Sequence, residues 1–182
     1  MLQDDYREYR HYRIFWRRFL AQWIDALLLQ PCTWLYALVM PHLTWPPTAV
    51  VWYGLHNYVA FTYFVLLHAR YGQTVGKRLL GIKVLDLSGV KLRPGQAVRR
   101  DLVTWLWATF DLVTSWPFLV QGREPIYPAG GIPRYIHLAG WGMVAWGFAE
   151  PLVMLTNEKR RSLHDFIAGS VVVRKEKGEW RV

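Results

Sequence analysis

Long apolar stretches, separated by short polar segments, dominate the sequence. Four of them, roughly residues 19–40, 49–69, 102–120 and 136–155, match the length of about 20 residues that a helix needs to cross a bilayer. A water-soluble helical protein with a buried core would carry wider polar faces on its helices. The pattern therefore predicts one all-α domain over residues 1–182, a polytopic membrane protein with four transmembrane helices.

Two segments outside the apolar stretches are predicted to form a small cap. In residues 70–101, Thr74 is suited to cap a short helix, and residues 82–92 alternate around a Ser-Gly pair, which is typical of a β-hairpin. Residues 170–174 form a further extended stretch that we expect to join the same sheet.

The tail, residues 156–182, also carries helix signals. Ser162 followed by Asp165 matches a capping box, and Gly169 is suited to end the short helix that the box begins. This reading gives His164 and Asp165 structural roles. A single histidine without a second ligand at metal-binding spacing is weak evidence for a metal site.

Composition agrees with a membrane protein and charge predicts its orientation. Hydrophobic residues make up 53% of the chain, and 11 residues are tryptophans. Of the 22 Lys and Arg residues, all except Arg123 and Arg134 lie before the first apolar stretch, in residues 70–101, or after the fourth stretch. By the positive-inside rule, both termini and residues 70–101 are cytoplasmic, in a plasma (inner) membrane. We read the net charge of +9 as orientation and attraction to anionic lipid, and expect no nucleic-acid partner.

Polar residues inside the apolar stretches are the main candidates for function. Arg18, Gln22 and Asp25 share one face of the first helix, although a carboxylate near the bilayer centre costs about 2.5–3.5 kcal/mol on insertion scales. Two interpretations stay open: these groups hydrogen-bond to one another and hold the helices in register, or they form a pathway. The proposed proton- or cation-binding residues are Asp25, Asp111, Glu150 and His56.

Asp25 and Arg18 are about 10 Å apart along a straight helix, so we expect Asp25 to find its partner on another span. The candidate partners are His56, Asn57, the Thr104–Asp111–Ser115 stripe and Glu150.

The sequence offers little support for nucleotide binding, a disulfide, metal binding or catalysis. GQTVGKR differs from a phosphate-binding loop, because only three residues separate Gly72 from Gly76 and Arg78 follows the lysine. Cys32 is the only cysteine, so no intrachain disulfide can form. We find no nucleophile–base pair and no metal-ligand set, and we expect no enzyme activity, cofactor or metal.

Three segments resemble the RDD family of small membrane proteins. They are R-x-x-A-x-x-x-D at Arg18–Asp25, GQTVGKRLLGIKVLDLSG, and RRSLHDFIAGSVVV. The family is named for an arginine and two aspartates, which the resemblance places at Arg18, Asp25 and Asp165. The remaining motif positions, which we assign to a cytoplasmic structural motif, are Gly76, Lys77, Arg78, Gly81, Ser162 and His164.

The resemblance implies a membrane-embedded domain for which transport, including cation/proton exchange, has been suggested. Transport of ions or small solutes by the intramembrane carboxylates is therefore our first hypothesis. The alternative is a non-enzymatic accessory or assembly subunit that docks a partner in a membrane complex. Four short helices would barely enclose a pathway, which makes a homodimer in the lipid bilayer a reasonable expectation.

Overall fold

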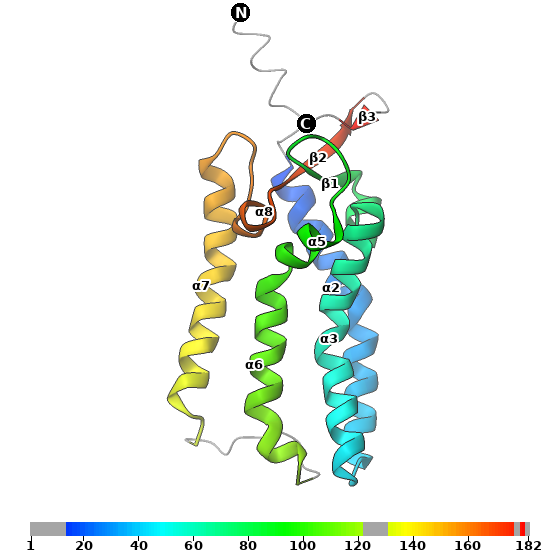
Figure 1. Cartoon of the computed structure of the whole chain (residues 1–182), viewed down its shortest axis with the longest axis vertical. Coiled ribbons are helices and arrows are strands. Elements are labelled where there is room, and N and C mark those ends of the chain that lie inside the picture. Colours follow the sequence, from blue (N-terminus) through cyan, green and yellow to red (C-terminus); the bar gives the residue numbers. More distant parts are fainter. Residues whose placement is uncertain (1–13, 122–130, 177–178, 181–182) are drawn as a thin grey trace, which may run out of the picture.

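Four long helices run side by side along the length of the molecule (Figure 1). The structure is a computed structural model and describes residues 14–121, 131–176 and 179–180. The long helices are α2 (Phe15–Val39), α3 (Pro46–Tyr71), α6 (Leu102–Leu119) and α7 (Arg134–Thr156), and a short 3-10 turn, η2 (Met40–His42), follows α2.

Three helical segments of the described chain are long and apolar enough to cross a membrane: Phe15–His42, Pro46–Tyr71 and Arg134–Thr156. They contain the predicted spans 19–40, 49–69 and 136–155. The predicted span 102–120 coincides with α6, which has 18 residues and is not one of the three. The fourth crossing therefore stays a prediction.

Short elements gather at the end of the molecule where α2 begins (Figure 1). We call them the polar cap. They are α4 (Val75–Leu79), β1 (Ile82–Asp86), α5 (Pro94–Arg100), α8 (Leu163–Ala168), β2 (Ser170–Glu176) and β3 (Glu179–Trp180). The predicted caps of two of these helices are confirmed, because Thr74 caps α4 and the Ser162–Asp165 capping box begins α8.

The sheet of the polar cap is antiparallel, in the order β1-β2-β3. Ile82 pairs with Arg174, and Asp86 pairs with Ser170, so the predicted pairing of these two segments is confirmed. The predicted hairpin over 82–92 is wrong. Asp86 Oδ1 accepts hydrogen bonds from the backbone N–H groups of Ser88 and Val90, which closes a turn and ends the strand.

The main hydrophobic core lies in the polar cap and not along the long helices. It joins the start of α2 to the sheet and consists of Ile14, Ala21, Ile82, Val84, Leu92 and Val172. A second cluster, at the opposite end, contains Met40, Ala49, Tyr53 and Leu119. Many other large apolar side chains of the long helices are exposed, above all in α2 and α7, as expected for helices that face lipid.

Candidate functional site

Asp25 is buried at the junction of α2, α3 and α4, with only 1% of its surface exposed. Its Oδ2 accepts a hydrogen bond from Thr74 Oγ1 at 2.6 Å, and its Oδ1 accepts from Tyr63 Oη at 2.7 Å and from the Gly76 backbone N–H at 2.8 Å. The charge of this carboxylate is thus stabilised by three donors.

The expectation that Asp25 finds a partner on another span is confirmed, because Tyr63 belongs to α3. The named candidates are wrong: the hydrogen-bond partners of Asp25 do not include His56, Asn57, Thr104, Asp111, Ser115 or Glu150. Two of the three donors come from α4 and its N-cap residue Thr74. The chain after α3 folds back against α2 and brings a capping hydroxyl and a free helix N–H group to the carboxylate.

Close packing of α4 on α2 depends on Gly76. A Cβ atom at this position would lie 2.3 Å from the carbonyl oxygen of Ala21, so only glycine allows this approach. Thr74 connects the two helices, since its Oγ1 donates to Asp25 of α2 and accepts from the backbone N–H of Lys77 in α4 at 3.3 Å.

Asp165 is fully buried and joins two arginines. Arg18 Nη2 lies 2.7 Å from Asp165 Oδ2, and Arg100 Nη1 donates to Asp165 Oδ1. Burial alone would raise the pKa of Asp165, but Arg100 and Arg18 hold that pKa well below its usual range. The arginine and the tail aspartate of the family motif therefore meet in space and connect α2, α5 and α8.

Glu150 and His164 connect α7 to α8. His164 Nδ1 lies 2.7 Å from Glu150 Oε2, and the His164 backbone N–H donates to Glu150 Oε1 at 3.1 Å. The other ring nitrogen, Nε2, lies 2.8 Å from Arg100 Nη2. Burial and the neighbouring Arg100 lower the pKa of His164 to about 4, so its imidazole is neutral at pH 7.

A third polar chain joins Lys77, His68 and Asp101. Lys77 Nζ lies 2.6 Å from His68 Nε2, and His68 Nδ1 lies 3.2 Å from Asp101 Oδ2. Lys77 and His68 are both buried. Sequence analysis gave Lys77 only a structural role and did not select His68 or Arg100. Their position at the boundary between apolar and charged segments was the available signal.

These groups surround a cavity of about 440 Å³, which we call the polar cavity. Its charged and titratable lining residues are Arg18, Asp25, His68, Lys77, Arg100, Asp101, Glu150 and His164; apolar lining residues include Phe15, Phe19, Phe64, Trp146 and Met154. Within the described part of the chain, no group of three or more His, Cys, Asp and Glu side chains could hold a metal ion.

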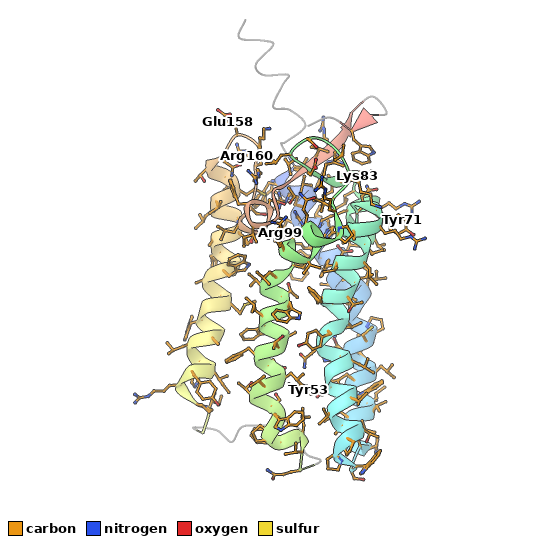
Figure 2. The ribbon with its side chains drawn as sticks, in the orientation of Figure 1. Tyr53, Tyr71, Lys83, Arg99, Glu158 and Arg160 are labelled. Atoms are coloured by element: carbon orange, nitrogen blue, oxygen red, sulfur yellow. The ribbon has the colours of Figure 1, made fainter. Side chains whose placement is uncertain are left out.

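Only two of the four predicted ion-binding residues, Asp25 and Glu150, line the polar cavity. Asp111 lies elsewhere and accepts a hydrogen bond from Tyr53 Oη at 2.6 Å. Figure 2 shows Tyr53 between α3 and α6, in the half of the molecule away from the polar cap. His56 stacks on Tyr36, with ring centroids 4.2 Å apart.

The other predicted motif residues hold the polar cap together to different degrees. Ser162 Oγ accepts from Arg18 Nη2 at 2.6 Å and is buried, whereas Arg78 is exposed. Gly81 has a φ of 65°, a conformation that favours glycine.

A mostly helical chain with three helices of membrane-crossing length, large exposed apolar surfaces and a polar cap defines a multi-pass membrane protein. The RDD family model matches residues 12–169, most of the sequence, and the chain belongs to the RDD family. No curated protein and no solved structure shows a significant match to it.

Proposed function

We propose that this protein exchanges small cations for protons across the plasma (inner) membrane and that the polar cavity is its binding site. The observation that carries this proposal is the composition of the cavity wall, where carboxylates (Asp25, Asp101 and Glu150) stand beside basic groups (Arg18, Lys77 and Arg100) at the end of a membrane bundle. Charged groups that are removed from water are costly, and a cavity open to water and ions would give them a function.

A second polar cluster extends the proposed pathway. Tyr53 contacts Asp111 and Ser115 between α3 and α6, whereas Tyr63 of the same helix contacts Asp25. Ten residues separate the two tyrosines, which corresponds to about 15 Å along the axis of α3. The cluster around Asp111 would be a second polar site for the cation, between the cavity and the opposite side of the membrane.

The proposed orientation places the polar cap in the cytoplasm, with α6 as a fourth crossing. The support is the concentration of Lys and Arg in the termini and in residues 70–101. A cysteine at Thr48, beside the turn between α2 and α3, should label from outside intact cells. A cysteine at Ser88 should label only after permeabilisation, and labelling of Ser88→Cys from outside would reverse the orientation.

One observation favours a second function, that of a non-enzymatic accessory or assembly subunit. Asp25 has three hydrogen-bond donors and is almost fully buried, as a residue that only fixes helix positions would be. In that case the exposed apolar side chains of α7 would contact a partner or a second copy of the chain.

Reconstitution into liposomes separates the two functions. A pH-sensitive dye is trapped inside, a proton gradient is imposed, and lithium, sodium, potassium or rubidium chloride is added outside. An exchanger should collapse the gradient with at least one cation, faster than in protein-free liposomes. Dye signals that match protein-free liposomes for every cation would reject exchange and leave the accessory role.

A further inference from the structure

Lys77 is an unusual lysine because its ammonium group is enclosed by protein. Only 8% of its surface is exposed, and its Nζ lies within hydrogen-bond distance of His68 Nε2, at 2.6 Å. None of the ion pairs within 4 Å in the described part of the chain involves Lys77. A buried lysine without a carboxylate in direct contact loses much of the preference for its charged form.

The geometry around His68 fixes which nitrogen faces the lysine. Asp101 Oδ2 lies 3.2 Å from His68 Nδ1, and a carboxylate there accepts the proton of Nδ1 and leaves Nε2 as an acceptor. A lysine N–H then donates to Nε2. The chain of contacts places a lysine, its acceptor and the group that orients the acceptor on three different elements, α4, α3 and the α5–α6 junction.

We propose that Lys77 is the residue that carries the exchanged proton in the polar cavity, with His68 and Asp101 as its positioning residues. This inference rests on the proposed exchange function and deepens it. A proton taken from the cavity adds to the neutral Nζ and forms the ammonium group, and its return to the cavity restores the amine. His68 Nε2 accepts a hydrogen bond from Nζ in both states.

The charges that face Lys77 from every side support this role. Arg18 and Asp25 approach from α2, and Arg100 and Asp101 approach from the α5–α6 junction. Burial, followed by repulsion from Arg100, lowers the pKa of Lys77 to about 7. The lysine can therefore gain and lose its proton near neutral pH.

The charge balance also indicates why a cation would replace the proton. With neutral histidines, the cavity wall and the adjoining Asp165 carry four carboxylates against Arg18, Arg100 and Lys77. Loss of the lysine proton adds one uncompensated negative charge, which favours a monovalent cation. Binding of that cation would in turn favour loss of the proton.

The first test is titration of the unaltered full chain in detergent micelles, which requires no transport. Lysine labelled with ¹⁵N at Nζ is followed by NMR from pH 5 to 10, and Lys77→Met assigns the Lys77 signal. We expect one lysine with a midpoint near pH 7 that is absent from Lys77→Met and retained in Lys83→Met, the matched control in β1. If all lysine midpoints lie above pH 9, the proposal is overturned. Should Lys77→Met fail to fold, the presence or absence of a midpoint near pH 7 in the unaltered chain still decides.

The second test addresses His68. His68→Phe keeps a planar ring but removes the acceptor, so the charged form of Lys77 loses a hydrogen bond and its midpoint should move to lower pH. The pH profile of exchange in liposomes should move in the same direction, whereas His42→Phe, a substitution at an exposed position in η2, should leave both unchanged. Unchanged midpoints in His68→Phe would remove His68 from the mechanism.

The two proposals fail in different ways. If liposomes show no exchange but Lys77 titrates near pH 7, the proposed function is rejected and the inference about Lys77 as an exchange residue is rejected with it. If exchange occurs and Lys77 titrates above pH 9, cation/proton exchange stands and a different residue carries the proton.

Discussion

The hydroxyl of Thr74 donates a hydrogen bond to Asp25 at 2.6 Å. The same hydroxyl caps α4 by accepting from the backbone N–H of Lys77. The carboxylate in the first membrane helix thus positions the short helix that presents Lys77 to the polar cavity. Together with the donors Tyr63 and Gly76, this contact explains how the charge of Asp25 is accommodated in an apolar segment.

Asp25→Asn should destabilise the contact between α2 and α4. An asparagine keeps the shape but offers one acceptor oxygen to donors that now occupy two, and it removes the negative charge. The loss of charge-assisted hydrogen bonds predicts a decrease of about 1–3 kcal/mol in stability, measured as a lower Tm in detergent. Asn57→Ala, which removes a side chain that bonds to Tyr53 of its own helix and is not a hydrogen-bond partner of Asp25, is the control. An Asp25→Asn protein as stable as the wild type would show that the three donors contribute little.

Gly76→Ala should separate α4 from α2. The added methyl group would lie 2.3 Å from the Ala21 carbonyl oxygen, and relief of such overpacking typically costs about 1–3 kcal/mol. Gly95 in α5 provides a matched control, since a Cβ atom there meets nothing within 4 Å. Gly95→Ala should be neutral or stabilising by up to about 1 kcal/mol. Equal Tm values for the two variants would contradict the proposed close approach.

Stability should decrease between pH 6.5 and pH 4 because of His164. Its pKa is about 4 in the folded protein and about 6.5 in an unfolded chain. Between these values the unfolded state binds the additional proton, so stability rises with pH across this window and is lost as the pH falls. His164→Gln should flatten this part of the Tm profile, whereas His42→Gln should not. A wild-type slope that persists in His164→Gln would assign the effect to other groups.

Local signals in the sequence predicted much of the fold. The apolar stretches predicted the long helices, and Thr74, Ser162 and Asp165 are side chains that complete hydrogen bonds within a few residues of their own position. The hairpin failed because Asp86 can close a turn with its own side chain, and periodicity does not report that competition.

The candidate site depended on contacts between distant segments. Lys77, Arg100 and Asp101 lie in a region whose charges indicated only orientation, and their proximity to His68 follows from the docking of α4 and α5 against α3. Thr74 indicated where the short helix α4 begins. Neither Thr74 nor Gly76 indicated that α4 packs on the helix that carries Asp25.

The central claim, that water and cations reach the polar cavity, can be tested most directly by thiol labelling. Thr104 of α6 lines the cavity, whereas Val113 of the same helix is 65% exposed on its outer surface. Each is changed to cysteine in a Cys32→Ser background and treated in liposomes with a charged, membrane-impermeant thiol reagent. Thr104→Cys should react, and the transported cation should slow the reaction, while Val113→Cys, facing lipid, stays unlabelled. If Thr104→Cys is as unreactive as Val113→Cys from both sides of the membrane, the cavity is closed to water and the account of exchange is contradicted.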